Sequence, residues 1–476
     1  MAKPKILFVV PTFSEHDQFV GIVNLEKKKR EVRAYPYLGV LYLIAGVKHK
    51  QRIDYDVDLI DAPAENLTVL ELAEKIKRKN PTILLLTCNT FTLRATKLTL
   101  DACRKEVPEA KIILGGIHIN HSAKDIEHFD VDYGLKGDCE FTVKPLVEAI
   151  LEGTSVKEIP GVIYKENGKV CYHPETPIIK DLDSIPFPDR TTIKPEHYVF
   201  PLFDKKFTTM ISTRGCPFAC AFCGLPYNKK YYKRSPENVV EEMKQLESLG
   251  YEFISFCDDV FTIDRRRIVK FCEVINNNNL KVKWGCSTRA DVVDYELLKL
   301  MKDSGCIDVR FGVESGSEKI RFGHLDKKIT NKQYYDALNW CKEVGLFVTG
   351  FFLFGHYGEK YEDMEETVRF AKSLNFDAVS FGIVVLIPRT EIYKKALEQG
   401  KVKEDIWKEV LEGKKELPFY CPEGVSLEAM RKLRAKANWD YYIRTKYIIS
   451  QFMKVRNVYD FVHRAKTGVN LLMNRG

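Results

Sequence analysis

The sequence predicts an α/β protein with two successive strand–helix regions and a helical C-terminal region. Residues 5–150 alternate short apolar runs with amphipathic stretches, which is typical of a parallel, doubly wound sheet. The same alternation resumes for six units over residues 206–400. Residues 426–442 and 447–464 carry an apolar stripe with helical spacing. We therefore expect four parts, bounded as 1–150, 151–205, 206–400 and 401–476.

The first region begins with a strand at residues 5–10, an apolar run too short for a signal sequence. Further strands are expected at 56–60, 83–88, 111–114 and 132–135, and helices at 38–50, 67–79, 92–106 and 143–151. Ligands of such sheets bind beyond the carboxyl ends of the strands. The candidate ligand residues at those ends are Thr12, Asn89, Thr90, Gly115, Gly116, His118 and Glu140.

A connector at residues 151–205 joins the two regions. Asn167-Gly168 predicts a hairpin between residues 161–164 and 169–172, and residues 181–190 are extended and interrupted by proline. In the second region strands are expected at 208–212, 253–257, 282–287, 308–313, 347–354 and 378–385. The helices between and after them are expected at 236–249, 265–276, 294–303, 331–344, 361–374 and 390–398.

The second region opens with the most specific feature of the chain. Cys216, Cys220 and Cys223 lie within eight residues, with the spacing C-x-x-x-C-x-x-C. Iron–sulfur clusters are normally held by four thiolates, so three thiolates leave one iron open to an outside ligand. Zinc prefers a closed tetrahedron, and the nearest histidines, His197 and His324, are distant in sequence. The loop directly follows a strand, at the functional face of α/β barrels.

At this loop the chain resembles the radical S-adenosylmethionine (SAM) enzymes. In that family three thiolates hold a 4Fe–4S cube on a partial (β/α)6 barrel, and the open iron binds SAM. Other strand ends carry similar segments: D-D-V-F at residues 258–261, T-R-A-D at 288–291, G-V-E-S-G at 312–316 and G-H-Y-G-E at 355–359. The resemblance implies SAM contacts from Phe222, Asp258, Asp259, Arg289 and Glu314. A salt-bridge or N-cap role for Glu314 is the alternative.

The first region resembles the cobalamin-binding domain of one radical SAM subfamily. The similar segments are Y-P-Y-L-G-V-L-Y-L at residues 35–43, G-G-I-H at 115–118 and G-D-C-E at 137–140, where Cys139 stands in place of a glycine. The connector segment at 181–190 resembles the bridge of the same subfamily. The resemblance implies that the seven strand-end residues named above bind cobalamin. The D-x-H-x-x-G motif is absent, as in that subfamily, so His118 is either a cobalt ligand or a turn histidine.

The resemblance implies an enzyme with three cofactors: a [4Fe–4S] cluster, SAM and cobalamin. Such enzymes generate a 5′-deoxyadenosyl radical, and the commonest reaction of the subfamily is methylation of an unactivated carbon. We expect a small-molecule or lipid-like substrate and an external one-electron reductant, a flavodoxin or ferredoxin. Neither the generation of the radical nor the methyl transfer needs an acid–base pair, so no catalytic residue is named. A radical rearrangement or cyclisation, and a non-catalytic corrinoid or cluster carrier, are the alternatives.

The basic tail leaves several partners open. Formal net charge is +8, and residues 428–476 alone carry eleven Lys or Arg against three acidic residues. The positive charge of such a tail is compatible with four surroundings: nucleic acid, an anionic lipid surface, an acidic substrate, or solvent alone. Methylthiotransferases of tRNA also end in a basic module, but theirs is a β domain, and they carry a second cysteine set that residues 1–150 do not match. We therefore expect a helical cap over the barrel, with peripheral membrane contact as the alternative and nucleic acid disfavoured.

Composition bounds the class of protein. The chain has 476 residues, of which 45% are hydrophobic and 29% charged, as in globular proteins of two or three domains. No run of eighteen apolar residues predicts a membrane span. The thirteen cysteines lack a regular disulfide spacing, which favours a reducing cytoplasm.

Overall fold

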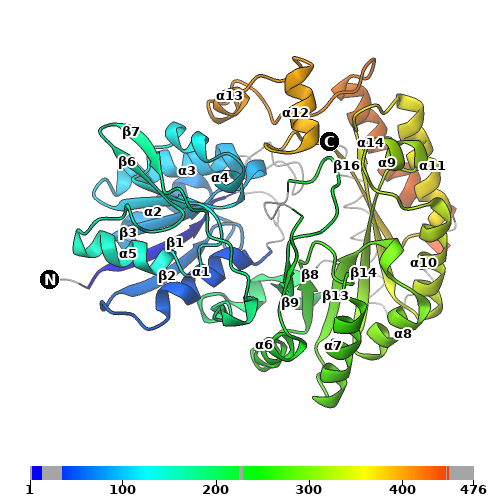
Figure 1. The fold of residues 1–476 in the computed structure, drawn as a ribbon, viewed down its shortest axis with the longest axis horizontal. Helices are drawn as coiled ribbons and strands as arrows, with labels where there is room; N and C mark the ends of the chain where they lie inside the picture. Colours follow the sequence, from blue (N-terminus) through cyan, green and yellow to red (C-terminus); the bar gives the residue numbers. More distant parts are fainter. Residues whose placement is uncertain (1–2, 13–34, 201, 225–228, 446, 450–476) are drawn as a thin grey trace.

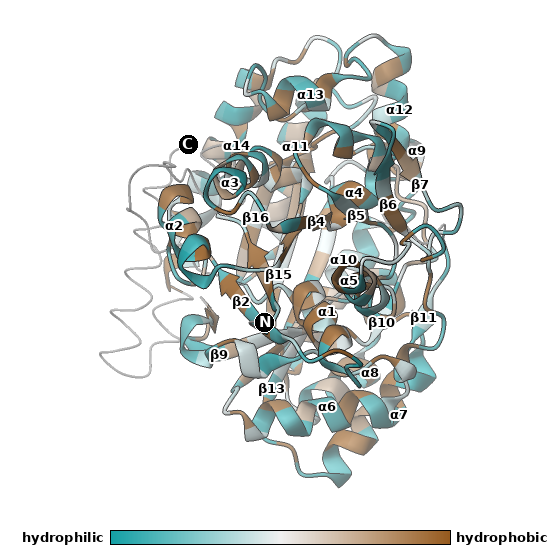
Figure 2. Ribbon diagram, turned by 90° about the vertical axis from the view of Figure 1, so that its left-hand side faces the viewer, coloured by the Kyte–Doolittle hydropathy of each residue, from teal (hydrophilic) through white to brown (hydrophobic). Residues whose placement is uncertain are grey.

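The computed structural model describes residues 3–12, 35–200, 202–224, 229–445 and 447–449. Two large sheets stand beside each other (Figure 1). Helices cover both faces of the first sheet and the outer side of the second. In Figure 2, teal and brown alternate along α6 and α7, as expected for helices with one buried face. Over the described ranges, no helix combines the length and the apolar character that a membrane crossing needs.

The first sheet has the strand order β2-β1-β3-β4-β5-β6-β7. Its parallel strands are β1 (Lys5–Val10), β2 (Asp56–Asp61), β3 (Ile83–Thr87), β4 (Lys111–Gly115) and β5 (Tyr133–Leu135). The covering helices are α1 (Leu38–Lys48), α2 (Val69–Lys79), α3 (Leu93–Glu106), the short α4 (Ile117–His121) and α5 (Val143–Glu152). Strand β1 is buried on both faces, because Leu7 and Val9 pack with α2 and α3 while Ile6 and Phe8 pack with α1 and α5. The predicted doubly wound sheet is confirmed.

The predicted hairpin forms and has a partner. Strands β6 (Val162–Glu166) and β7 (Lys169–Tyr172) pair around Asn167-Gly168, and both turn residues have positive φ. Strand β6 also pairs antiparallel with β5. The hairpin therefore extends the first sheet.

The second sheet is the curved sheet of the predicted partial barrel. Its order is β16-β15-β14-β13-β12-β9-β8. The six parallel strands are β9 (Lys205–Met210), β12 (Phe253–Phe256), β13 (Lys283–Thr288), β14 (Cys306–Glu314), β15 (Phe347–Phe354) and β16 (Ala378–Ile383), and β8 (Val199–Phe200) is antiparallel. Helices α6 (Pro236–Ser248), α7 (Arg265–Asn277), α8 (Tyr295–Asp303), α10 (Asn331–Glu343) and α11 (Tyr361–Leu374) cover its outer side (Figure 1). The inner face turns toward the first sheet.

The C-terminal part returns to both halves of the protein. Helices α12 (Glu391–Glu398) and α13 (Ile406–Leu411) pack into the core around α3, where Trp407 is fully buried. Helix α14 (Leu427–Tyr442) lies on the second sheet, and the Tyr442 hydroxyl donates to the Val379 carbonyl at 2.7 Å. The helix expected at 426–442 is confirmed, whereas the one expected at 447–464 lies almost entirely outside the described residues.

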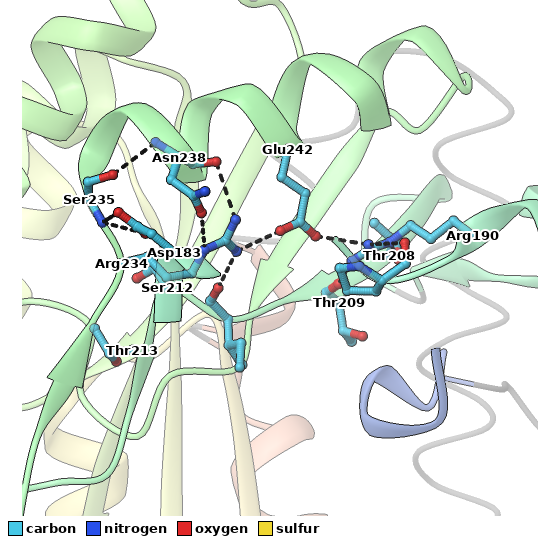
Figure 3. A network of polar contacts seen from close by, with 12 residues as sticks. Asp183, Arg190, Thr208, Thr209, Ser212, Thr213, Arg234, Ser235, Asn238 and Glu242 are labelled. Carbon is cyan, nitrogen blue, oxygen red and sulfur yellow. Dashed lines mark hydrogen bonds and ion pairs between the residues drawn. The ribbon is translucent and has the colours of Figure 1, made fainter. Parts of the chain in front are cut away.

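A buried charge network anchors the connector to the barrel (Figure 3). Glu242 on α6 is 1% exposed and pairs with Arg190 of the connector at 2.8 Å and with Arg234 at 2.6 Å. Arg190 also donates to the Thr209 carbonyl of β9 at 2.8 Å, and Arg234 to the Ile211 carbonyl at 2.9 Å. The bridge segment is therefore attached to the strand that leads into the cysteine loop.

Candidate functional site

The three cysteines lie in a loop whose backbone is hydrogen-bonded to two other segments. The loop follows β10 (Thr213–Arg214), and Ala221 within it donates to the Leu325 carbonyl at 3.2 Å and accepts from the Ile392 amide at 3.1 Å. Cys216 and Cys220 are half-buried and Cys223 is exposed. A loop tied to two distant segments of the barrel presents these thiols in a set arrangement.

Burial dominates the pKa of the thiols in this loop, and nearby cations oppose it. Burial raises the pKa of the Cys216 thiol, with Asp259 adding to the rise, while the Phe218 amide and Arg289 act to lower it. Burial likewise raises the pKa of Cys220, against Lys327 and Arg289. In the described part of the chain, no three His, Cys, Asp or Glu side chains converge on a single metal ion. A cubic cluster binds each thiolate through a different iron, so its three cysteine ligands need not converge on one point.

Two acidic residues after β12 differ in their surroundings. Asp258 is 3% exposed, and its carboxylate accepts from the Ser212 amide at 2.7 Å, the Ser212 hydroxyl at 2.6 Å and the Thr213 amide at 2.7 Å. The Asp259 side chain is accessible, but protein atoms around it displace part of its water, and this desolvation together with the neighbouring Asp258 raises its pKa to about 6. Asp258 therefore ties β12 to the start of the cysteine loop, and Asp259 offers the accessible carboxyl group.

The ends of β13 and β14 supply a cation and a carboxylate. Arg289 forms two hydrogen bonds with Asp291, at 2.9 and 2.7 Å, and its guanidinium lies 3.6 Å from the ring centre of Phe218, inside the cysteine loop. Glu314 has a φ of 70° and pairs with the buried Lys327 at 3.0 Å. The expected salt-bridge alternative for Glu314 thus has a partner, and the strained backbone is typical of functional positions.

The end of β15 holds two buried ionisable groups. His356 is fully buried, its ring lies 5.7 Å from that of Phe222, and burial lowers its pKa to about 3. Glu359 accepts from the amides of Gly355 and His356 at 2.8 and 2.9 Å, and burial raises its pKa to about 8. The sequence reasoning did not select Lys327, His356 or Glu359. Only the G-H-Y-G-E segment signalled the last two.

The candidate cobalamin residues follow β1, β3, β4 and β5 at one edge of the first sheet. Thr12 is buried, and the Asn89 side chain accepts from the Phe91 amide. Gly116 has a φ of 107°, and a side chain there would overlap the backbone of Cys88. With Gly115 at the end of β4, this turn satisfies a packing requirement as well as permitting close ligand approach.

His118 is occupied by protein partners. Its two ring nitrogens lie 3.2 Å from the Thr90 hydroxyl and 3.2 Å from the Asp125 carboxylate. Its ring is fully buried and packs edge-on against Trp407, with the ring centres 5.3 Å apart. Of the two roles considered for His118, this geometry favours a structural turn histidine.

The two halves meet beside the cysteine loop. His121 of α4 pairs with the Gly224 carbonyl, next to Cys223, at 2.5 Å. Glu140 and Asp138 both pair with Arg214, and all three side chains are at most 9% exposed. The Glu140 carboxylate therefore binds the chain two residues before Cys216. The carboxyl edge of the first sheet lies directly against the cysteine loop.

Comparisons with known proteins agree with this geometry. The Radical SAM superfamily matches residues 210–371 and the B12 binding domain matches residues 34–146. An uncharacterized methyltransferase of Pyrococcus horikoshii, PH0819, is 31% identical over 94% of this chain and 95% of its own. This chain belongs to the cobalamin-dependent radical SAM family. Its cofactors are accordingly a [4Fe–4S] cluster, SAM and cobalamin, and the fold class predicted from the sequence is that of the family.

A further relative and a solved structure of the same fold extend the comparison. The anaerobic magnesium-protoporphyrin IX monomethyl ester cyclase of Cereibacter sphaeroides is 28% identical over 78% of this chain and 61% of its own. The radical SAM methyltransferase TsrM of Kitasatospora setae, solved with cobalamin and a [4Fe–4S] cluster bound, shares the fold with a TM-score of 0.66 at 18% identity, over 84% of this chain and 75% of that one. This family enzyme thus has relatives named for methylation and for ring closure.

Proposed function

We propose that this enzyme methylates an unactivated carbon of a small organic molecule. The supporting observation is the direct contact between the cysteine loop and the carboxyl edge of the B12-binding domain, through His121–Gly224 and Glu140–Arg214. Groups bound at these two places would share one space. When bound, the cluster and SAM supply a carbon radical, and cobalamin supplies methyl transfer.

Some residues of this site would contact the cluster or SAM, and others would hold those residues in place. We propose that Cys216, Cys220 and Cys223 hold the cluster, and that Phe222, Asp259, Arg289 and Glu314 contact SAM. Charged acceptors such as Asp259 and Glu314 suit an ammonium group or a ribose diol. Asp258 supports the site through Ser212 and Thr213, since its carboxylate already accepts three hydrogen bonds.

On the cobalamin side we propose contacts from Thr12, Asn89, Gly115 and the backbone of Gly116. Thr90 and His118 bind each other, and Glu140 binds Arg214. The side chains of Thr90, His118 and Glu140 would shape the edge on which the corrin lies. A corrinoid retained by anaerobically reconstituted protein supports this assignment, whereas protein that stays corrinoid-free contradicts it.

Product analysis tests the reaction. Reconstituted enzyme with methyl-labelled SAM and a reductant should form both 5′-deoxyadenosine and S-adenosylhomocysteine, together with a labelled product. A Cys220→Ala variant, which lacks one of the three thiols, is expected to form neither. Formation of 5′-deoxyadenosine alone would favour a cyclisation, the second candidate, which the similarity to the cyclase supports.

We also propose an electron donor and a substrate class for this enzyme. A flavodoxin or ferredoxin would supply the electron, and the thirteen free cysteines fit a reducing cytoplasm. The substrate is a small molecule, and a lipid-like molecule is the more specific form of this proposal. Flotation with anionic liposomes tests peripheral membrane contact, which is ruled out if the protein does not float with the liposomes.

A further inference from the structure

Lys327 is a buried cation to which the proposed function gives no role. Its side chain is 6% exposed, and it pairs with Glu314 at 3.0 Å. Its ammonium group also donates to the Gly312 carbonyl at 2.6 Å. Apolar residues often replace a buried ion pair without loss of stability, so stability alone does not explain why this pair is present.

The backbone around this ion pair holds the ammonium group in place. The register of β14 shifts between Gly312 and Glu314, and Glu314 has a φ of 70°. A Cβ at Gly312 would overlap the Glu314 carboxylate and would lie 3.1 Å from the Lys327 ammonium group. The Lys327 amide donates to the Arg321 carbonyl at 3.0 Å, and the Tyr334 hydroxyl donates to the Gly312 carbonyl at 3.1 Å. Both the ammonium group and its acceptors are therefore fixed by the surrounding chain.

The segment that carries Lys327 is joined to the cysteine loop. The Leu325 carbonyl, two residues earlier, accepts from the Ala221 amide at 3.2 Å, and Ala221 directly follows Cys220. Burial raises the pKa of Cys220, and Lys327 is the strongest of the groups that oppose this rise. Glu314 acts in the opposite direction and less strongly. The ion pair therefore presents its positive end to the Cys220 sulfur.

Lys327 keeps its charge in this buried position. Burial acts to lower its pKa, but Glu314, Tyr334 and Cys220 act in the opposite direction, and together they raise the pKa above its usual value. An ammonium group has three N–H donors. Among the described residues its acceptors are Gly312 and Glu314, so one donor remains for an anionic group beside Cys220.

We propose that Lys327 raises the reduction potential of the cluster held by the three cysteines, and that Glu314 limits this effect. The inference rests on the proposed function, which places the cluster there. A cluster with three thiolate ligands is an anion, and the electron from the external donor adds one more negative charge. A cation beside Cys220 stabilises the reduced form more than the oxidised form, because the attraction grows with the charge.

Redox titration of the reconstituted enzyme, without SAM or substrate, tests this role. Lys327→Met removes the charge from a side chain of similar length. It should weaken reduction by a donor of fixed potential about tenfold, which for a one-electron couple is a shift of about 59 mV to a more negative potential. Glu314→Gln should shift the potential in the opposite direction and by less. Lys328→Met is the matched control, because Lys328 is the next residue and is exposed, and its potential should equal that of the parent.

Loss of Lys327 alone leaves the Glu314 carboxylate buried without its partner, so the double variant K327M/E314Q serves where the single one misfolds. Its potential should lie between those of K327M and the parent, because the cation acts on Cys220 more strongly than the carboxylate does. A parent-like potential in both Lys327 variants, or shifts of the same sign in K327M and E314Q, overturns the inference. Weaker SAM binding by K327M at an unchanged potential also overturns it, because Lys327 would then serve SAM and not the cluster.

The proposed function is judged separately on products of the parent enzyme. An enzyme that forms S-adenosylhomocysteine and 5′-deoxyadenosine, but whose variants keep the parent potential, retains its function and loses this role for Lys327. Potentials that shift as expected in an enzyme without a methylated product retain the role and contradict the proposed function.

Discussion

Replacing Glu242 by glutamine should destabilise the start of the barrel strongly. This carboxylate is shared by Arg190 and Arg234, and all three side chains are at most 3% exposed (Figure 3). Removing one member of a buried ion pair costs about 3–5 kcal/mol, because the remaining charge stays buried without its partner. Both arginines keep backbone carbonyls as acceptors, at Thr209 and Ile211. We therefore expect a loss near the lower limit, about 3 kcal/mol.

Hydrogen exchange over α6 measures this loss locally, which matters because a chain of this size need not unfold in one step. A loss of about 3 kcal/mol corresponds to exchange about a hundredfold faster. The matched control is Glu241→Gln on the same helix, since Glu241 is 56% exposed and pairs with Lys244, itself 41% exposed, at 3.1 Å. Its exchange should change about twofold at most. Wild-type exchange in the Glu242 variant would refute the electrostatic reasoning.

Three further perturbations have expected outcomes. Gly46→Ala should lower the melting temperature, because the new methyl group overlaps the Glu140 carbonyl. Gly39→Ala on the same helix meets nothing within 4 Å and should be neutral or stabilising. Equal melting temperatures of the two variants would contradict this packing. The folded-state pKa of Glu359 is raised from 4.5 to about 8, so wild-type stability is lost as pH rises through that interval. Glu359→Gln should therefore match the parent at pH 5 and melt higher at pH 8.5, and parallel pH profiles would argue against a protonated Glu359. Iron analysis of reconstituted enzyme should give about four irons per chain and far fewer in Cys220→Ala, while about eight would indicate a second cluster.

The apolar periodicity of the sequence predicts the fold well and the element ends less well. The first strand of the barrel was expected at 208–212 and runs from Lys205 to Met210, because its last expected residues turn away to bind Asp258 and Arg234. Strand β14 was expected to end at 313 and includes Glu314, which follows an irregular register. Alternation predicts that a strand exists, but these ends depend on contacts with distant residues.

The candidate site shows the same division. Strand-end positions could be predicted, since parallel strands bring their carboxyl ends to one edge. The partner of each side chain could not. Asp258 binds a residue 46 positions earlier, and Glu140 binds Arg214, 74 positions later. Lys327, which pairs with Glu314, stands in a polar segment with no distinguishing pattern.

These long-range partners also make the two halves of the enzyme mutually dependent. One apolar core joins β1 and α1 of the first sheet to Phe207 and Phe253 of the second, and another joins α3 to Trp407, which follows the barrel in sequence. The B12-binding domain therefore completes its core only with segments from the other half. Polar contacts that include Glu140–Arg214 and His121–Gly224 join the halves as well. Because apolar packing and these contacts hold the halves together, the cysteine loop and the corrinoid edge face each other at a distance set by the fold.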